Sequence, residues 1–442
     1  MFMKGDYAGV IARFSSRIDR SSVSDEDREI VAWSSIMLGN SLAEQAELAQ
    51  GEESVALFAA ADERYAAALA VRPDKPEALN NWGNSLLEQA RRASGEKMAT
   101  MFAAASEKYA AALAIRPHDH EALYNWANTL SEQACLSSGE KAFSLFAAAD
   151  EKYASALAIK PDKHEAVYNW GNSLLAQARR AGAEGAAAFF AAADEKYAMS
   201  LAVKPDKDEA LNNWGNSLLE QARRAGDEDA TALFAAAGEK YAAALAVKSD
   251  KHKTMNNWGN LLSEQAKRAS DKGAAALFAA AGGKYAAALA INTDDYEALN
   301  NWGTLLLEQA KRAAPEEAPK LFAAASEKYP AAVAIKPDKH QALNNWGTLL
   351  LEQAKLADGD EASALFSSAG EKYAAVAKIE PGETCNLACL AALCQDEIVC
   401  RRHLENAERH GTLPDRQHLV SDLDLASVQD RLWFLEMLGR QA

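Results

Sequence analysis

The sequence lacks several features that mark particular classes of protein. No run of about 18 apolar residues is long enough to cross a bilayer, and no N-terminal stretch has the pattern of an export signal. Basic residues are outnumbered, 47 against 63 acidic ones, which gives a formal net charge of -16. Nucleic acids and anionic membranes both attract basic surfaces. We therefore expect a soluble protein that binds neither nucleic acid nor a membrane.

Cysteine is scarce, and four of the five cysteines are crowded into one segment near the C-terminus. An odd number in this arrangement is not the framework of a disulfide-stabilised secreted domain, so we expect a reducing cytoplasm. The cysteines and a nearby histidine also lack the close C-x2-C pairs of structural zinc sites, so we predict no bound metal. The residues concerned are Cys385, Cys389, Cys394, Cys400 and His403.

Motifs that carry common catalytic chemistry are missing as well. The sequence has no G-x-S-x-G turn, no phosphate-binding G-x4-G-K-[ST] loop and no H-E-x-x-H pair. A chain this repetitive also leaves little irregular sequence in which a unique catalytic arrangement could be built. We expect neither an enzyme nor a cofactor.

What the chain does have is repetition. The segment LNNWGNSLLEQARRA at residues 79–93 returns unchanged at 211–225, and edited copies recur between and beyond. Its tryptophan recurs every 44 residues, and self-similarity at such a period is typical of a stacked-repeat fold. The members of this column are Trp82, Trp126, Trp170, Trp214, Trp258, Trp302 and Trp346.

Residues 74–117 illustrate the repeating unit. Asp74, followed three residues later by a glutamate, has the pattern of a helix start, and Gly95 is expected to end that first helix. A second helix is expected from about Met98, and Pro117 would end it because proline cannot continue the hydrogen-bond ladder.

On a helical wheel the first helix has two different faces. Leu79, Trp82, Gly83 and Leu86 share a side that would pack, and the asparagines and Ser85 share the side that would meet solvent or a ligand. In the second helix, bulky residues alternate with alanine, which lets the helix axes approach to about 8 to 10 Å.

The unit resembles the tetratricopeptide repeat, a helix-turn-helix motif. The A-x3-F-x2-A-x4-P spacing of its second helix is reproduced by Ala105, Tyr109, Ala112 and Pro117. The first helix matches the family pattern W-x2-L-G-x2-Y with the tryptophan and leucine places exchanged, at Leu79 and Trp82. The period of 44 exceeds the usual period of about 34, so both helices would be extended at their shared turn. The resemblance implies an all-α, right-handed superhelical α-solenoid that binds protein.

The register of the repeats divides the chain into four parts. We expect an N-terminal half-repeat and lead-in over residues 1–29, followed by eight 44-residue repeats over 30–381. A ninth, short repeat would occupy 382–412, and residues 413–442 resemble the helices that cap some arrays of this family. The half-repeat rests on the spacing of Tyr7, Val10, Ile11 and Phe14. The cap would cover the last exposed face with Leu432, Phe434, Leu435 and Leu438.

Columns of asparagine follow the first helices. A side-chain amide offers one acceptor and two donors, so a row of amides can hold an extended peptide by its backbone without reading its sequence. The resemblance implies a concave groove lined in this way. In the alternative interpretation, the amides only hydrogen-bond the neighbouring helix. The candidate residues are Asn80, Asn81, Asn84, Asn125, Asn128, Asn169, Asn172, Asn213, Asn216, Asn257, Asn260, Asn301 and Asn345.

Tyrosines and basic residues interrupt or flank these columns. Tyr124 and Tyr168 would either stack on a partner's side chain or fill local packing. Basic pairs such as Arg91 and Arg92 would either clamp an acidic ligand or offset the helix dipole and nearby glutamates. The stack itself would be built by the tryptophan column and by Tyr109, Tyr153 and Tyr197.

Two functions follow from these patterns and remain open. The first is a protein-protein interaction module that holds an extended peptide or a partner helix in the groove. The second is a structural or regulatory scaffold that self-associates or docks a whole partner enzyme. Many equivalent contacts and little site-specific tuning suit both functions.

Overall fold

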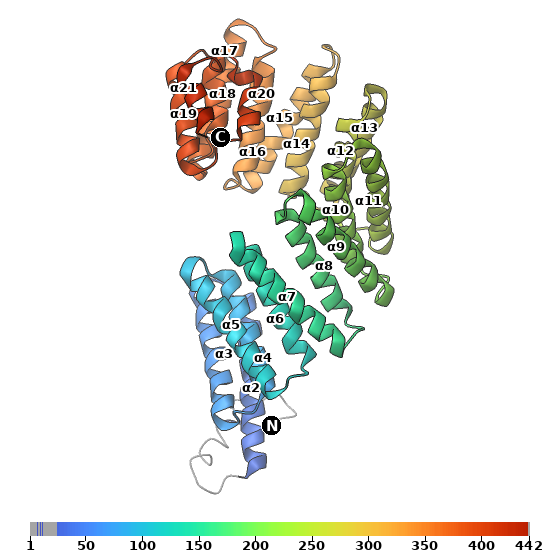
Figure 1. The fold of residues 1–442 in the computed structure, drawn as a ribbon, viewed down its shortest axis with the longest axis vertical. Coiled ribbons are helices and arrows are strands. Elements are labelled where there is room, and N and C mark those ends of the chain that lie inside the picture. The colour runs from blue at the N-terminus through green and yellow to red at the C-terminus, as the bar shows by residue number, and fades with distance from the viewer. Residues whose placement is uncertain (1–6, 8, 10, 12–23, 441–442) are drawn as a thin grey trace. The chain divides into compact units, whose positions relative to one another are not determined.

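The structure is a computed structural model, and it describes residues 7, 9, 11 and 24–440 of the chain. Its regular elements are helices, with no strand among the described residues, so the predicted all-α repeat fold is confirmed (Figure 1). The expected N-terminal half-repeat depends on Val10 and Phe14, which lie outside the described residues.

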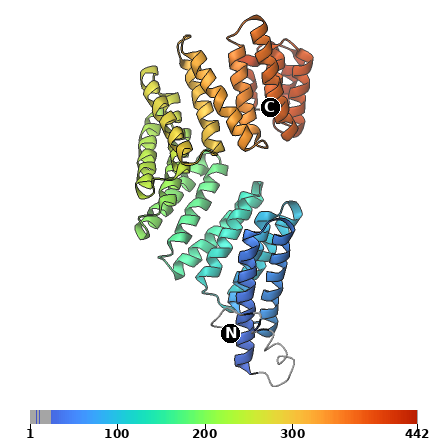
Figure 2. The ribbon, with the colours of Figure 1, turned by 180° about the vertical axis from the view of Figure 1, so that it is seen from behind.

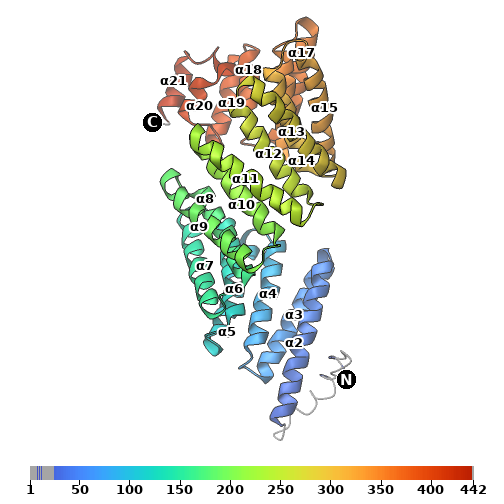
Figure 3. The same cartoon turned by 90° about the vertical axis from the view of Figure 1, so that its right-hand side faces the viewer.

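The chain forms two compact units, residues 1–224 and 225–442. Within each unit the helices lie side by side in chain order, as the views from behind and from the side also show (Figures 2 and 3). The helices of the first unit are α2 (Asp25–Leu48), α3 (Gly51–Val71), α4 (Pro76–Arg92), α5 (Gly95–Ile115), α6 (His120–Cys135), α7 (Gly139–Ile159), α8 (His164–Arg180), α9 (Ala183–Val203) and α10 (Asp208–Arg224).

The second unit continues the alternation of a first and a second helix and then ends in shorter elements. Its elements are α11 (Asp227–Val247), α12 (His252–Arg268), α13 (Asp271–Ile291), α14 (Tyr296–Arg312), α15 (Ala318–Ile335), α16 (His340–Ala354), α17 (Gly359–Ile379), α18 (Cys385–Leu393), α19 (Glu397–His410), α20 (Arg416–Ser421), the 3-10 helix η2 (Leu423–Leu425) and α21 (Leu432–Gly439).

The start of the first helix differs from the prediction by one residue. Asp74 does not cap α4, because its carboxylate accepts from the guanidinium of Arg72 instead and Lys75 occupies the cap position. The cap position holds a carboxylate only in some repeats. Asp119 accepts from two backbone amides of α6, and Asp295 from one of α14. The expected capping pattern was therefore wrong for residues 74–117, since the acidic residue precedes the cap position there.

The turn between the two helices of a pair is shorter than expected. Helix α4 ends at Arg92, and α5 begins at Gly95, whose φ of 58° lies in the left-handed region that glycine adopts without strain. Gly95 therefore begins the second helix and does not end the first. With 17 residues in α4 and 21 in α5, both helices carry the extra length of the 44-residue period.

The core of a helix pair is a tyrosine of the second helix that lies against a glycine of the first. A Cβ added at Gly83 would lie 2.6 Å from Cε1 of Tyr109, and one added at Gly303 would lie 2.8 Å from Cε1 of Tyr329. These tyrosines are fully buried, as are Tyr153 and Tyr197. Glycine leaves room for the ring at this distance, and α6 carries Ala127 at the same place.

The tryptophan column is less buried than the tyrosines. The ammonium group of Lys108 lies 3.6 Å from the ring centroid of Trp82, and Lys284 lies 3.4 Å from that of Trp258. Each of the seven rings is half-buried, with one face on the apolar core. The packing face is therefore broader than the wheel predicted, since Ser85, expected on the solvent side, is almost fully buried.

The cap of the second unit buries only part of the predicted set. Phe434 and Leu438 lie in the terminal core with Met437. Leu432 and Leu435 are 79% and 50% exposed, so the expectation that they cover the last face was wrong. In so short a helix, a shift of one residue moves a side chain by about 100° around the axis and decides which leucines face inward.

One helix contradicts the expectation that no segment is apolar enough to cross a bilayer. Helix α13 passes that test by length and composition. In the structure its Phe278, Ala281, Tyr285 and Ala288 are buried in the second unit, at the positions that other second helices also bury. The apolar composition of α13 is consistent with a helix of the repeat core.

Candidate partner-binding groove

The asparagines of consecutive first helices hydrogen-bond one another. The amide of Asn81 donates to Oδ1 of Asn40 over 3.0 Å, and that of Asn125 donates to Oδ1 of Asn80 over 3.1 Å. These bonds are the contact to a neighbouring helix that the alternative interpretation of the columns described. In the second unit similar bonds run from Asn301 to Asn256, from Asn345 to Asn300 and from Asn386 to Asn344.

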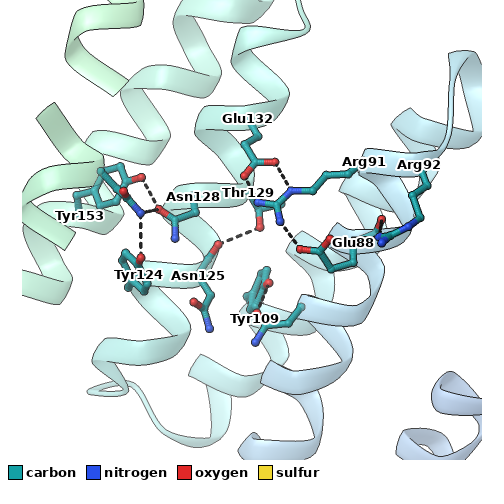
Figure 4. A network of polar contacts seen from close by, with 12 residues as sticks. Glu88, Arg91, Arg92, Tyr109, Tyr124, Asn125, Asn128, Thr129, Glu132 and Tyr153 are labelled. Atoms are coloured by element: carbon teal, nitrogen blue, oxygen red, sulfur yellow. Dashed lines mark hydrogen bonds and ion pairs between the residues drawn. The ribbon is translucent and has the colours of Figure 1, made fainter. Parts of the chain in front are cut away.

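Tyr124 and Tyr168 take part in the same network. The amide of Asn169 donates to the Tyr124 hydroxyl over 2.9 Å and to Oδ1 of Asn128 over 3.1 Å, which uses both of its hydrogens (Figure 4). The amide of Asn213 donates in the same way to the Tyr168 hydroxyl and to Oδ1 of Asn172, each over 2.9 Å. Both tyrosine hydroxyls are therefore acceptors within the stack.

The third asparagine column holds the core tyrosines in place. The hydroxyl of Tyr109 donates to Oδ1 of Asn84 over 2.8 Å, and that of Tyr153 to Oδ1 of Asn128 over 2.7 Å. Burial raises the pKa of both tyrosines, so the hydroxyls remain protonated and keep donating. Asn172 and Asn260 accept from Tyr197 and Tyr285 in the same way.

The ladder nevertheless leaves some amide atoms open. Oδ1 of Asn84, Asn128 and Asn172 accepts from the core tyrosine, whereas their amide nitrogens have no partner among the described residues and are not enclosed. Oδ1 of Asn125 and of Asn169 is open too. In α4, by contrast, Asn80 donates to Oδ1 of the neighbouring Asn81, whereas Tyr124 of α6 makes no such bond to Asn125 among the described residues. In α6 and α8, where a tyrosine replaces the first asparagine, Oδ1 of Asn125 and of Asn169 therefore stays open beside an amide that donates.

The second arginine of each basic pair joins two consecutive repeats. Arg92 donates to the backbone oxygen of Glu47 at the end of α2 over 3.0 Å, and its guanidinium lies 5.3 Å from the ring centroid of Phe58. Arg180 donates to the backbone oxygen of Cys135 over 2.6 Å. These arginines satisfy the last carbonyls of the preceding first helix and favour its dipole. These arginines therefore offset a helix dipole, and the dipole concerned is that of the preceding first helix.

The first arginine of the pair is also bound within the protein. Arg91 Nε donates to Glu132 on the next first helix over 2.8 Å, and the guanidinium contacts Glu88 as well (Figure 4). The hydrogen bond with Glu132 raises the pKa of Arg91. Arg179 makes a forked contact with Glu220 over 2.9 and 2.5 Å. Neither arginine is free to clamp an acidic ligand.

Two adjoining hollows in the first unit form one groove, which we call the ladder groove. One hollow of about 430 Å³ and another of about 590 Å³ share Arg91, Tyr124 and Asn128 in their walls. The groove runs across the first helices α2, α4, α6 and α8. It brings together the predicted residues Asn81, Asn84, Asn125, Asn128, Asn169, Asn172 and Tyr124.

The other predicted residues lie elsewhere. Asn80 faces a separate hollow near the start of α6, and Tyr168, Asn213 and Asn216 lie further along the first unit on α8 and α10. The second unit holds a corresponding set on α12, α14 and α16. These are Asn257, Asn260, Asn301 and Asn345.

Two groove residues were missed by sequence reasoning, Glu44 and Glu47 of α2. The signal was present as an exception in a column, because Glu47 stands 44 residues before Arg91 and so occupies the place of a basic residue. Glu47 is thus an acidic residue in a column that is basic in most other repeats.

The cysteines form no metal site in the described part of the chain, where no group of three or more potential ligands is assembled. All five thiols are free. Burial raises the pKa of Cys385 to about 11 and that of Cys400 to about 12, so both thiols stay protonated at neutral pH. Buried protonated thiols of this kind behave as small apolar side chains.

Repeated helix pairs with a tyrosine packed on a small residue, joined by a polar ladder along their first helices, define a tetratricopeptide-like repeat protein. The resemblance predicted from the second-helix spacing is confirmed in this sense.

Comparison with known families points to the same kind of repeat. A sequence profile of the plant-specific mitochondrial import receptor subunit TOM20 matches residues 52–146 and 276–396, together just under half of the chain. A comparison with curated proteins finds no match to the sequence.

Solved structures similar to this one are also tetratricopeptide repeat proteins. YrrB, described as a TPR protein with an unusual peptide-binding site, is 16% identical, with a TM-score of 0.34 over 54% of this chain and 97% of its own. TTC0263, a thermophilic TPR protein of Thermus thermophilus, is 18% identical, with a TM-score of 0.36 over 51% of this chain and 99% of its own. Yeast Tom70 is 14% identical, with a TM-score of 0.44 over 87% of this chain and 68% of its own.

Proposed function

We propose that this chain is a non-catalytic protein-binding module that holds an extended peptide, or a partner helix, in the ladder groove. The observation that carries the proposal is the set of open amide atoms. A free donor on Asn128 and a free acceptor on Asn125 recur on the next helix as Asn172 and Asn169. A peptide backbone presents a carbonyl and an N-H group at each residue, which are the complements of this donor and acceptor.

The spacing of the repeats suits an extended occupant. First helices that pack about 9 to 10 Å apart would meet every third residue of a segment that advances about 3.1 to 3.3 Å per residue. An occupant held in this way would be recognised by its backbone, with Tyr124 adding a surface for an apolar or proline side chain.

The family comparison supports a protein as the partner, because the matching profile describes a receptor subunit for protein import. We propose the cytoplasm as the compartment, on the basis of five free thiols. The mitochondrial setting belongs to that family's description.

Site-specific cross-linking tests the groove more cleanly than substitution of asparagines, because Asn169 and Asn213 also hold the stack together. A photoreactive side chain at Tyr124 and, as a matched control, at the exposed Glu107 of α5 would be combined with random 15-residue segments displayed on phage. We expect enriched segments to cross-link at position 124 only. Equal cross-linking at position 107, or no enrichment from the library, would contradict the proposal.

The scaffold alternative is favoured by a different observation, the exposed Leu432 and Leu435 of α21. Exposed leucines at the end of an array suit contact with a second copy or a large partner. Light scattering at several concentrations tests this function. A defined oligomer that is lost when both leucines are changed to serine would favour the scaffold, and a monomer at all concentrations would argue against it.

A further inference from the structure

The walls of the ladder groove carry an excess of negative charge. Four carboxylates line the two hollows, and Arg91 is the one cationic side chain among the lining residues of the described chain. Arg91 is already bound to two of these carboxylates. The four acidic residues are Glu44, Glu47, Glu88 and Glu132.

The two remaining carboxylates belong to α2 and have no cationic partner among the described residues. In α4 and α8 the place of Glu47 holds Arg91 and Arg179, and each of these arginines neutralises a glutamate of the next first helix. Helix α2 lacks this basic residue, so Glu44 and Glu47 line the groove with their charges unmatched. Burial raises the pKa of Tyr65, which also lines the groove, and the negative charges of Asp62, Glu44 and Glu47 raise it further.

We propose that the occupant of the ladder groove is a cationic segment of a partner protein, with a lysine or arginine side chain between Glu44 and Glu47. This inference rests on the proposed function and adds the charge of the partner to it. The amide atoms of α6 and α8 hold the backbone, and the carboxylates of α2 select the basic side chain.

The distance between these two parts of the groove sets the position of the basic residue. Helices α2 and α6 are two repeats apart, or about 18 to 20 Å if neighbouring first helices pack about 9 to 10 Å apart. An extended segment covers that distance in about six residues. The lysine or arginine should therefore lie about six residues from the part of the segment that contacts Asn125 and Asn128.

The test measures the charge of the segments that the protein selects. Wild type, Glu44→Gln with Glu47→Gln, and the control Glu52→Gln with Glu53→Gln would be used to select from the same displayed library. The control removes the same charge from exposed positions at the start of α3 that do not line the ladder groove. We expect wild type and control to enrich lysine- and arginine-containing segments and the groove variant to lose that preference.

Binding of one selected peptide then gives the size of the effect. Replacing its basic residue with glutamine should weaken binding to wild type roughly three- to tenfold, as for one or two partly exposed ion pairs, and the loss should grow at low ionic strength. The groove variant should respond by less than about twofold, because the coupling between peptide and carboxylates is gone.

Several outcomes would overturn the inference. Enrichment of acidic segments, or an equal loss in the control variant, would do so directly. Segments that cross-link at position 124 without any charge preference would leave the proposed function standing and remove only its extension to a cationic partner. Binding that appears only after residues 1–23 are deleted would assign the groove to the chain's own N-terminal segment, which carries Lys4, Arg13, Arg17 and Arg20.

Discussion

The two units use the same helix pairs but fill the joint between consecutive pairs with different chemistry. In the first unit the half-buried aspartates of α3 and α9 accept from side chains of the following first helix. Asp62 accepts from Ser85 over 3.1 Å, and Asp194 accepts from Ser217 over 2.6 Å. In α11 and α13 of the second unit a glycine takes the place of the aspartate, and a leucine takes the place of the serine, as in Gly282 beside Leu305.

This exchange shows that the residues of a joint change together. A carboxylate needs donors when it is buried, and a leucine needs a small neighbour, so each pairing is consistent only with its own partner. The polar joints of α3 and α9 lie in the unit that contains the ladder groove. The following predictions exchange or weaken the features that distinguish the units.

The largest effect should come from making an apolar joint polar. Leu305→Ser leaves a cavity and an unsatisfied hydroxyl at a buried position, which should cost about 3 to 5 kcal/mol. Hydrogen exchange should show the loss of protection centred on α12, α13 and α14, as expected for a fold in which each repeat contacts mainly its neighbours. Adding Gly282→Asp recreates the polar pairing and should recover about 1 kcal/mol. A double variant less stable than Leu305→Ser would contradict this account.

The tyrosine-on-glycine core should respond alike in both units. Gly171→Ala and Gly303→Ala each add a Cβ that would lie within 3 Å of a buried tyrosine ring, so each should cost about 1 to 3 kcal/mol by overpacking. Urea denaturation of the two variants measures this. The control is Ala127→Gly in α6, which removes a methyl group from a helix pair that already accommodates an alanine at this place. A cost confined to one unit would show that the pairs do not share one core.

The pH dependence of stability should differ between the units. Burial raises the pKa of Asp62 and Asp150 above the ordinary value of 3.8. At these two positions the folded state then holds a proton more tightly than the unfolded state, so the two aspartates should add stability to the first unit as pH falls from neutral towards 3.8. The lowered pKa of Glu29 and of Glu165 acts in the opposite direction. Hydrogen exchange between about pH 4 and 7 measures each unit separately. Asp62→Asn with Asp150→Asn should flatten the profile of the first unit, and an unchanged profile would refute the assignment.

The smallest effect should come from the exposed ion pairs. The arginines of the first unit bridge two helices, whereas Lys311 of the second unit contacts Glu308 on its own helix. Arg179→Lys loses the forked contact with Glu220 and should cost less than about 1 kcal/mol, because the pair is partly exposed. Lys311→Arg is the reverse change and should be neutral or slightly stabilising in thermal unfolding. A cost above about 2 kcal/mol for either change would mean that these pairs do more than join surfaces.

The repeat architecture could be predicted from sequence because its cause is periodic. The tryptophan column and the Ala105, Tyr109 and Ala112 spacing fixed which residues share a face, and the helices formed where this spacing required. The turn and cap were placed less well. The role of Gly95 is ambiguous in the sequence because a glycine can end one helix or begin the next, and the two roles differ only in backbone dihedral angles.

The site was predictable in location but not in detail. The asparagine columns identified the wall of the groove, yet an amide has both a donor and an acceptor end. Only the distance to the next helix shows that Asn169 uses its donors inside the stack and leaves its acceptor open. The net charge of the groove depends on which arginine forms an ion pair with which glutamate of the next repeat. The sequence of one 44-residue repeat does not contain that information.

Within each unit the ladder has a direction, since the amides of Asn125, Asn169, Asn301 and Asn345 each donate to an oxygen of the repeat before. Asn128 supplies an acceptor to the following repeat, and the amide of Asn386 meets Asn344 where the series ends. A 44-residue segment copied into either unit would therefore bring one donor for its predecessor and one acceptor for its successor. Such a gene could gain or lose whole repeats without breaking the hydrogen bonds between consecutive repeats, and the length of its groove would change in steps of one helix.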